Sequence, residues 1–80
     1  MYYVYVLRST KDPNRIYIGY TSNLEARFRK HNEGASVHTS KYRPWNLAWY
    51  CAFPSKLNAI KFETYLKSHS GKAFFNKRLV

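Results

Sequence analysis

The chain is short, rich in aromatic residues and strongly basic, and these properties exclude several classes of protein. Its 80 residues suit one domain spanning 1–80, and 45% apolar residues are too many for a disordered chain. Fourteen Lys and Arg against four Asp and Glu give a net charge of +10. This excess favours a nucleic-acid partner over a basic surface that serves only solubility.

The cysteine content and the hydropathy pattern indicate the compartment. The single cysteine, Cys51, excludes an intrachain disulfide framework and suits a reducing environment. Since it lies in an apolar strand pattern, we expect it in the core. No run approaches the ~18 apolar residues of a membrane span, and the N-terminus does not resemble a signal peptide. We therefore expect a soluble, cytoplasmic protein that makes no membrane contact.

Two short aromatic segments open the chain and predict an antiparallel hairpin. Residues 2–7 and 15–20 are β-branched and aromatic, and a turn-forming segment that includes Asp12, Pro13 and Asn14 joins them. Side chains alternate across a strand, so pairing Leu7 with Arg15 would place Tyr5 opposite Tyr17 on one face. A slip of one residue would separate the two tyrosines.

A helix follows the hairpin and begins at Thr21 or Ser22. Ser22 and Glu25 have the spacing of a capping box, and Gly34 is placed to end the helix in a left-handed conformation. At ~100° per residue, Arg27 and His31 fall on one flank of the apolar stripe of this helix, one turn apart. Residues 35–44 then read as a polar, basic loop.

The second half of the chain predicts a third strand and two more helices. Residues 46–53 form the strand, 56–68 a helix and 72–79 a last short helix after a break at 69–71. Phe74, Phe75 and Leu79 should pack the last helix. The strand should present Leu47, Trp49, Cys51 and Phe53 on one face and Ala48, Tyr50 and Ala52 on the other. The fold class expected is therefore α+β, a small three-stranded antiparallel sheet flanked by helices in the order β-β-α-β-α-α.

Glu63 is the most informative acidic residue, because it lies on the apolar stripe of its helix. An unpaired buried carboxylate is costly, so Glu63 needs either a salt bridge to a nearby Arg or a bound cation. The other acids suit a turn, a helix cap and a helix end. A site with two metals clamped by several carboxylates is therefore excluded, whereas one Mg²⁺ held by one carboxylate, water and phosphate is allowed.

Two tripeptides of the hairpin, Tyr3-Val4-Tyr5 and Tyr17-Ile18-Gly19, are followed by Arg27 and by the later Glu63. In this order they resemble the GIY-YIG endonuclease domain, above all its small stand-alone bacterial members related to the excinuclease nuclease domain. His31, one turn after Arg27, and the segment Phe75-Asn76 extend the likeness over nearly the whole chain.

The resemblance implies a metal-dependent endonuclease that hydrolyses phosphodiester bonds in DNA, with selectivity for DNA structures in repair or recombination. Tyr17 would accept a proton from the attacking water with Tyr5 orienting it, although the two tyrosines could exchange roles. Arg27 would stabilise the phosphorane, His31 would assist at the phosphate, and Glu63 would hold Mg²⁺ or Mn²⁺. The residues expected to contact nucleic acid are Gly19, Arg29, Lys30, His38, Lys41, Arg43, Lys72 and Asn76.

Each of these residues also has a purely structural interpretation. Tyr5 and Tyr17 suit any aromatic hairpin, Arg27 is one cation among fourteen, and His31 could complement a helix dipole. Gly19 could mark either a bulge or a close approach of backbone and substrate. The main alternative function is a nucleic-acid-binding module without catalysis, and a third is a protein-interaction domain. The carboxylate on the second helix favours catalysis, because phosphate binding does not need it.

Overall fold

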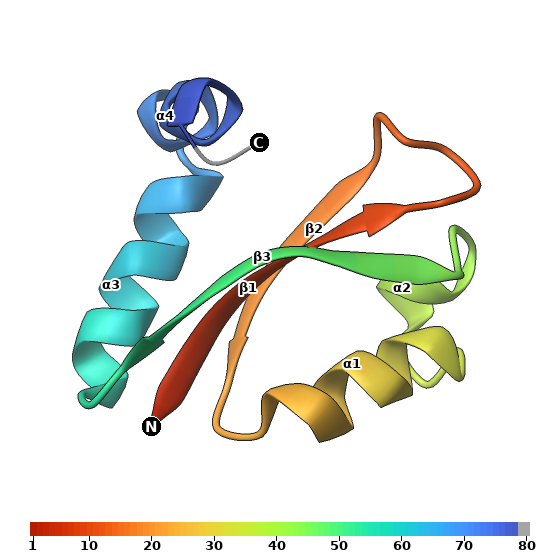
Figure 1. Cartoon of the computed structure of the whole chain (residues 1–80), viewed down its shortest axis with the longest axis horizontal. Coiled ribbons are helices and arrows are strands. Elements are labelled where there is room, and N and C mark those ends of the chain that lie inside the picture. The colour runs from red at the N-terminus through yellow and green to blue at the C-terminus, as the bar shows by residue number, and fades with distance from the viewer. Residues whose placement is uncertain (79–80) are drawn as a thin grey trace.

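The computed structural model describes residues 1–78, without the side chains of residues 69, 72, 75, 76 and 78. Within them, β1 (Tyr2–Ser9), β2 (Ile16–Thr21) and β3 (Trp45–Phe53) form an antiparallel sheet in the order β2-β1-β3 (Figure 1). The helices are α1 (Leu24–Asn32), α2 (Val37–Ser40), α3 (Lys56–Lys67) and α4 (His69–Arg78). The expected α+β class is confirmed, and α2 is a short helix inside the predicted loop 35–44.

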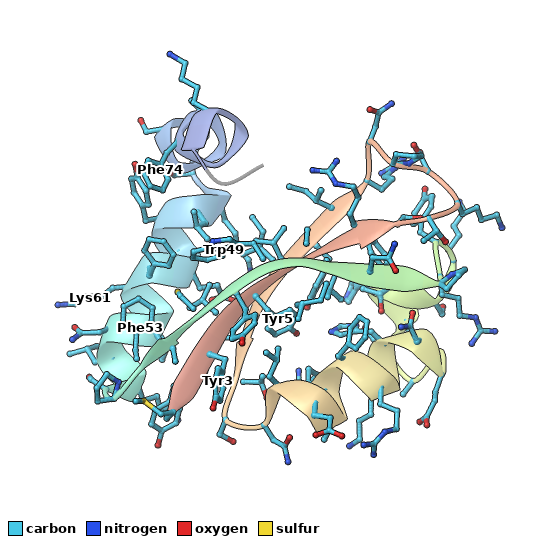
Figure 2. All side chains as sticks on the ribbon, viewed as in Figure 1. Tyr3, Tyr5, Trp49, Phe53, Lys61 and Phe74 are labelled. Carbon is cyan, nitrogen blue, oxygen red and sulfur yellow. The ribbon has the colours of Figure 1, made fainter. Side chains whose placement is uncertain are left out.

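The two faces of the sheet are covered by different helices (Figure 1). Under α3, an apolar cluster contains Val4, Val6, Ile18, Ala59 and Leu66. The opposite face holds a second cluster of Tyr5, Leu7 and Trp45, against which Leu24 and Phe28 of α1 pack. In Figure 2, Trp49 and Phe53 lie toward α3, whereas Tyr3 and Tyr5 lie toward α1. Residues that alternate along β1 therefore enter two separate cores.

The predicted hairpin register is wrong by two residues. Tyr5 pairs with Gly19, and Tyr17 pairs with Leu7. β1 continues to Ser9, further toward the turn than expected, and the Ser9 hydroxyl there accepts hydrogen bonds from the backbone N–H groups of Lys11 and Asp12 at 3.1 and 3.0 Å. A shift of two residues keeps every side chain on its face, so Tyr5 and Tyr17 still share one side of the sheet.

A bulge in β3 overturns part of the predicted facing pattern. Val6 pairs with Trp49 and Leu7 with Leu47, so Ala48 is an extra residue in β3. Leu47 therefore lies on the α1 face with Leu7, and the prediction that it shares a face with Trp49 is wrong. The sequence alternates regularly through this segment and contains no signal for the bulge.

The helix ends differ from the prediction at two places. Asn23 caps α1, because its side chain accepts a hydrogen bond from the Ala26 N–H, so the expected Ser22 cap is wrong. Gly34 has a φ of 80°, which confirms the left-handed end of this helix. The turn between α3 and α4 comes at Ser68, before the expected break at 69–71.

Part of the last helix lies outside what the structure describes. The side chain of Phe74 packs against the α3 cluster, as predicted. The expected packing involves the side chain of Phe75 and the whole of Leu79, which lie outside what the structure describes. Across the described residues, no helix is both long enough and apolar enough to span a bilayer.

Candidate functional site

Tyr5 is the first residue of a buried hydrogen-bonded chain under α1. Its hydroxyl lies 2.9 Å from Nε2 of His31, and the two side chains are 1% and 2% exposed. Tyr5 reaches this position from the central strand, and His31 from the last turn of α1. The sequence predicted His31 on a flank of the helix, but the structure buries it against the sheet.

Thr39 completes this chain and was missed by the sequence analysis. Its hydroxyl lies 2.8 Å from Nδ1 of His31, and its carbonyl accepts a hydrogen bond of 2.8 Å from the Trp45 indole N–H. Thr39 is fully buried in α2. One hydroxyl in a polar stretch of sequence carries no signal of this contact, because the contact depends on how residues 35–44 fold back over α1.

The hydrogen-bond pattern indicates the tautomer of His31. Burial, and then the positive charge of Arg27, lower the pKa of His31, so its ring is neutral at pH 7. A phenol is a better donor than acceptor, and the Tyr5 hydroxyl lies within hydrogen-bond distance of Nε2. Tyr5 therefore donates to Nε2, and Nδ1–H donates to the Thr39 hydroxyl. A neutral imidazole carries no positive charge that could complement the dipole of α1.

Tyr17 and Gly19 form the β2 side of the site. The Tyr17 ring lies 4.9 Å from the His31 ring and 6.3 Å from the Tyr5 ring, measured between centroids. Gly19 gives the Tyr5 ring its space, because a Cβ at position 19 would come 2.6 Å from the Tyr5 hydroxyl. The β1–β2 register is continuous through Gly19, so Gly19 does not mark a bulge.

Arg27 lines three of the described hollows, and two of them bring other candidate residues beside it. The first, of about 210 Å³, is lined by Tyr17, Arg27, Lys30 and His31 together with Ala35 and Ser36. The second, of about 380 Å³, places Arg27 with Tyr20 and Lys56. Arg27 is exposed, and no ion pair joins it to an acid among the described residues. Its guanidinium is therefore available to an anion, and Lys56 is a second cation that the sequence analysis did not connect with it.

The electrostatics of Tyr5 reflect its burial and its charged neighbours. Burial raises the pKa of Tyr5 to about 12, the neighbouring Tyr17 adds to the rise, Arg27 opposes it, and the Glu63 carboxylate raises it further. Tyr5 is therefore a neutral hydrogen-bond donor at pH 7. Arg27 and Glu63, from helices on different faces of the sheet, both act on the same phenol.

Glu63 pairs with a lysine and not with the arginine that one of its two sequence-based expectations named. Its side chain is 15% exposed and pairs at 3.2 Å with Lys67, which is 52% exposed and one turn along α3. The alternative of a buried salt bridge to Arg is therefore wrong, and the pair with Lys67 is of the surface type that contributes about 0.3–0.5 kcal/mol.

The arrangement of the acidic residues determines which kind of metal coordination this site allows. No cluster of three or more His, Cys, Asp or Glu that could hold a metal ion occurs among the described residues. Glu63 thus offers a single carboxylate. This donor set fits Mg²⁺ or Mn²⁺ held largely by water and substrate phosphate, and it does not fit a cage made by the protein.

The other residues expected to contact nucleic acid are spread over the molecule. Lys30 lines the hollow beside Arg27, and Arg29 instead pairs with Glu25 at 3.6 Å. His38, Lys41 and Arg43 are exposed, with Lys41 over the Tyr42 ring at 5.7 Å and Arg43 packed across Gly34. The side chains of Lys72 and Asn76 lie outside what the structure describes.

Comparison with known proteins identifies the family. Residues 1–78 match the model of the GIY-YIG catalytic domain, so the chain belongs to this family. The solution structure of a UPF0213 protein from Bacillus halodurans has the same fold, with a TM-score of 0.57 and 32% identity. The superposition covers 96% of this chain and 84% of that one.

Curated relatives of two kinds are similar in sequence. The structure-specific endonuclease subunit SLX1 homolog of Giardia intestinalis is 40% identical over 65 residues, which are 76% of this chain and 18% of that protein. SLX1 of Yarrowia lipolytica is 41% identical over 82% of this chain and 25% of its own length. A UPF0213 protein of Vibrio campbellii is 37% identical over 80% of this chain and 61% of its own. The chain thus spans a quarter or less of these two SLX1 relatives.

Proposed function

We propose that the protein is a metal-dependent endonuclease that hydrolyses phosphodiester bonds in DNA in the cytoplasm. The observation that carries this proposal is the hollow in which Tyr17, Arg27 and His31 meet. Tyr5 and Thr39 position the His31 ring through buried hydrogen bonds to its two nitrogens. A surface that only binds phosphates does not require a neutral, oriented imidazole beneath its cations.

The two tyrosines differ in exposure, and this difference supports different roles for them. Tyr17 lines the hollow and is partly exposed, so it is the phenol that accepts a proton from the attacking water. Tyr5 is 1% exposed, and it orients His31 and the Tyr17 ring from below. Of the two role assignments left open by the sequence, these exposures favour Tyr17 as the base.

Arg27 and Glu63 supply the charge that hydrolysis needs. Arg27 is exposed in the hollow, and its guanidinium neutralises charge that develops on the phosphorus oxygens. Glu63 is the residue that would hold Mg²⁺ or Mn²⁺, after release of Lys67. The bound cation would supply Lewis-acid stabilisation of the phosphate and of the leaving oxygen.

The names of the relatives suggest the substrate. The Giardia and Yarrowia proteins are named structure-specific endonuclease subunits. We propose the same preference here, for branched or flapped DNA over plain duplex, with a role in DNA repair. A relation to the excinuclease nuclease domain stays a prediction.

The affinity for DNA should fall log-linearly with salt concentration, because the chain carries a charge of +10.

A nicking assay with Glu63→Gln tests the proposal against a binding module without catalysis. The parent protein should cut branched DNA with Mg²⁺ or Mn²⁺ and not with a chelator, and Glu63→Gln should abolish cutting but keep DNA affinity. Thermal stability should change little, because the Lys67 pair is of the surface type. Glu33→Gln, which alters an exposed acid, is the matched control. Metal-independent binding without cutting by the parent would favour the binding module.

A further inference from the structure

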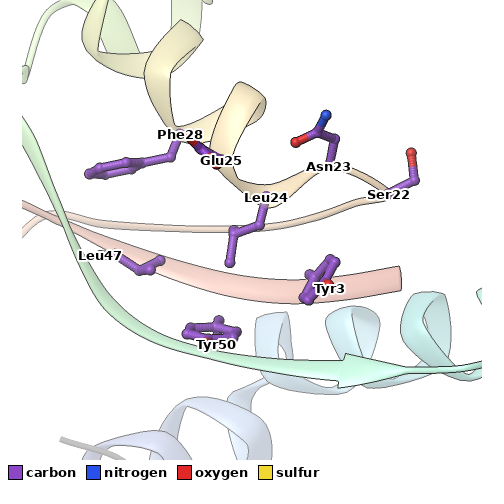
Figure 3. Close-up of a pocket in the computed structure, with 8 residues that line it drawn as sticks. All are labelled: Tyr3, Ser22, Asn23, Leu24, Glu25, Phe28, Leu47 and Tyr50. Carbon is purple, nitrogen blue, oxygen red and sulfur yellow. The ribbon is translucent and has the colours of Figure 1, made fainter. Parts of the chain in front are cut away.

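A second pocket lies on the other flank of α1, away from the hollow that holds Tyr17 and His31. Its volume is about 520 Å³, the largest of the pockets described. Figure 3 shows it between α1 and the strands β1 and β3. The residues that line it are Tyr3, Ser22, Asn23, Leu24, Glu25, Phe28, Leu47 and Tyr50.

The wall of this pocket presents aromatic and aliphatic surface to solvent. Tyr50 is 52% exposed and Leu47 is 37% exposed, although both lie on a strand. The rings of Tyr3 and Tyr50 are 6.3 Å apart between centroids and tilted by 57°. Because Tyr50 is half exposed, part of its ring surface is available, and planar aromatic groups stack well on such surfaces.

The pocket shares lining residues with a hollow beside the candidate active site. Ser22 and Asn23 line this pocket and also a smaller hollow that contains Arg27. Tyr3 is two residues from Tyr5 on the same face of β1, a separation of roughly 6.6 Å at the usual strand rise. A nucleic-acid strand whose phosphate contacts Arg27 can therefore pass the first turn of α1 and reach the pocket with a neighbouring nucleotide.

We propose that this pocket binds one unpaired base of the DNA strand that is being cleaved, stacked on Tyr50. The inference rests on the proposed nuclease function and deepens it, since it requires substrate nucleotides that are free of a base pair. The net charge of +10 favours a polyanion as the occupant and opposes a second copy of the chain. Stacking on an aromatic ring tolerates any base, so a preference among bases must come from the polar groups of the pocket.

Glu25 gives the pocket a preference among bases. Its carboxylate lies at the rim, with its side chain 87% exposed and an exposed partner, Arg29, at 3.6 Å. A carboxylate accepts hydrogen bonds from exocyclic amino groups, which cytosine, adenine and guanine carry and thymine lacks. The pocket should therefore disfavour thymine, and Glu25→Gln should reduce this discrimination.

Abasic scanning of a branched DNA tests the proposal without cleavage. The probe is a DNA duplex with a short single-stranded branch, in which one abasic nucleotide is moved along the unpaired positions. Affinity is measured in a chelator at fixed salt for the parent, Tyr50→Ala and Tyr50→Phe. In the parent, one position should lower affinity roughly five- to a hundred-fold, the range expected for losing one stacked base. Tyr50→Ala should bind the intact branch weakly and be insensitive to the abasic position, whereas Tyr50→Phe should behave as the parent.

The control variant is Tyr65→Ala, which removes a tyrosine of similar exposure, 42%, from α3. It should retain the position-dependent loss. If Tyr50→Ala does not fold by circular dichroism, Leu47→Ala in the same wall replaces it, with Leu57→Ala, 59% exposed, as its control. Equal losses at all positions, or equal responses in the pocket and control variants, would overturn the inference.

Cleavage by the same preparations separates the two proposals. A protein that cuts branched DNA with Mn²⁺ but shows no sensitive abasic position is a nuclease without this base site. A protein with one sensitive position that depends on Tyr50, but with no cutting, has the base site and lacks the proposed nuclease activity. Only the first of these results contradicts the inference about the pocket.

Discussion

The face of the sheet under α3 and the face under α1 share the same three strands but bury different chemistry. Under α3 the buried cluster is apolar, with Val4, Val6 and Leu66 at 0% exposure. Under α1, Tyr5 and His31 are almost as completely buried and are joined by a hydrogen bond. A small domain can afford few buried polar groups, so their concentration on one face indicates where function constrains the sequence.

The sharpest contrast comes from removing Leu66 from the α3 face. Leu66→Ala should lower the free energy of unfolding by about 2–5 kcal/mol, because it leaves a cavity in a fully buried cluster. The cleavage rate per folded molecule should stay near that of the parent. Chemical denaturation and single-turnover cleavage at low temperature measure the two effects. Leu57→Ala, on the exposed side of the same helix, should change neither.

Removing Arg27 from the α1 face should have the opposite effects, so that stability is retained and cleavage is lost. Arg27 is exposed, so Arg27→Ala should keep the melting temperature while cleavage falls by ~10²-fold or more, the scale of losing an oriented charge stabiliser. Lys61→Ala, which removes an exposed cation from α3 (Figure 2), is the control for net charge. Equal losses in both variants would mean that Arg27 acts only as surface charge.

Variants of Thr39 test whether the buried series of hydrogen bonds positions the catalytic residues. Thr39→Val keeps the shape but removes the partner of His31 Nδ1, and it should slow cleavage by roughly 5- to 100-fold. Thr39→Ser should restore most of the rate. The ¹⁵N chemical shifts of the His31 ring report the tautomer directly, with the proton on Nδ1 in the parent. A proton on Nε2 in the parent would contradict the assigned direction of these hydrogen bonds, in which Tyr5 donates to Nε2 and Nδ1–H donates to Thr39.

The smallest expected effect is on the pH dependence of stability. Folding lowers the pKa of His31, so below about pH 6.5 the unfolded chain binds a proton that the folded state resists. Stability contributed by the neutral ring is present above that pH and is lost as the pH falls toward the lowered folded value. Urea denaturation at pH 7.5 and 5.5 should show the loss in the parent, and a smaller one in His31→Gln.

Alternation and spacing in the sequence were sufficient for the faces of the hairpin tyrosines, but not for strand pairing or for every residue of the third strand. Strand alternation placed Tyr5 and Tyr17 on one side even though the register was wrong by two residues, because an even shift preserves the face. Leu47 was misplaced, since the bulge at Ala48 arises from the pairing of two strands and leaves no local pattern. The left-handed residue after α1 was predictable, because glycine favours that conformation.

The parts of the site that the sequence did not reveal all depend on long-range contacts. Thr39 reaches His31 only because α2 packs beside α1, and Lys56 joins Arg27 from the start of α3. The role of Gly19 was also unexpected, since its missing side chain makes room for the Tyr5 hydroxyl. Periodicity within one element does not encode distances between elements.

The most direct test of the nuclease site under α1 is single-turnover cleavage of branched DNA by Tyr17→Phe. The change removes one oxygen from a partly exposed ring, so folding and DNA affinity should stay as in the parent. The account predicts a fall in the cleavage rate of ~10²-fold or more, the scale of a lost general base. A Tyr17→Phe protein that cuts as fast as the parent would contradict the assignment of Tyr17 and, with it, the chemistry proposed for this face of the sheet.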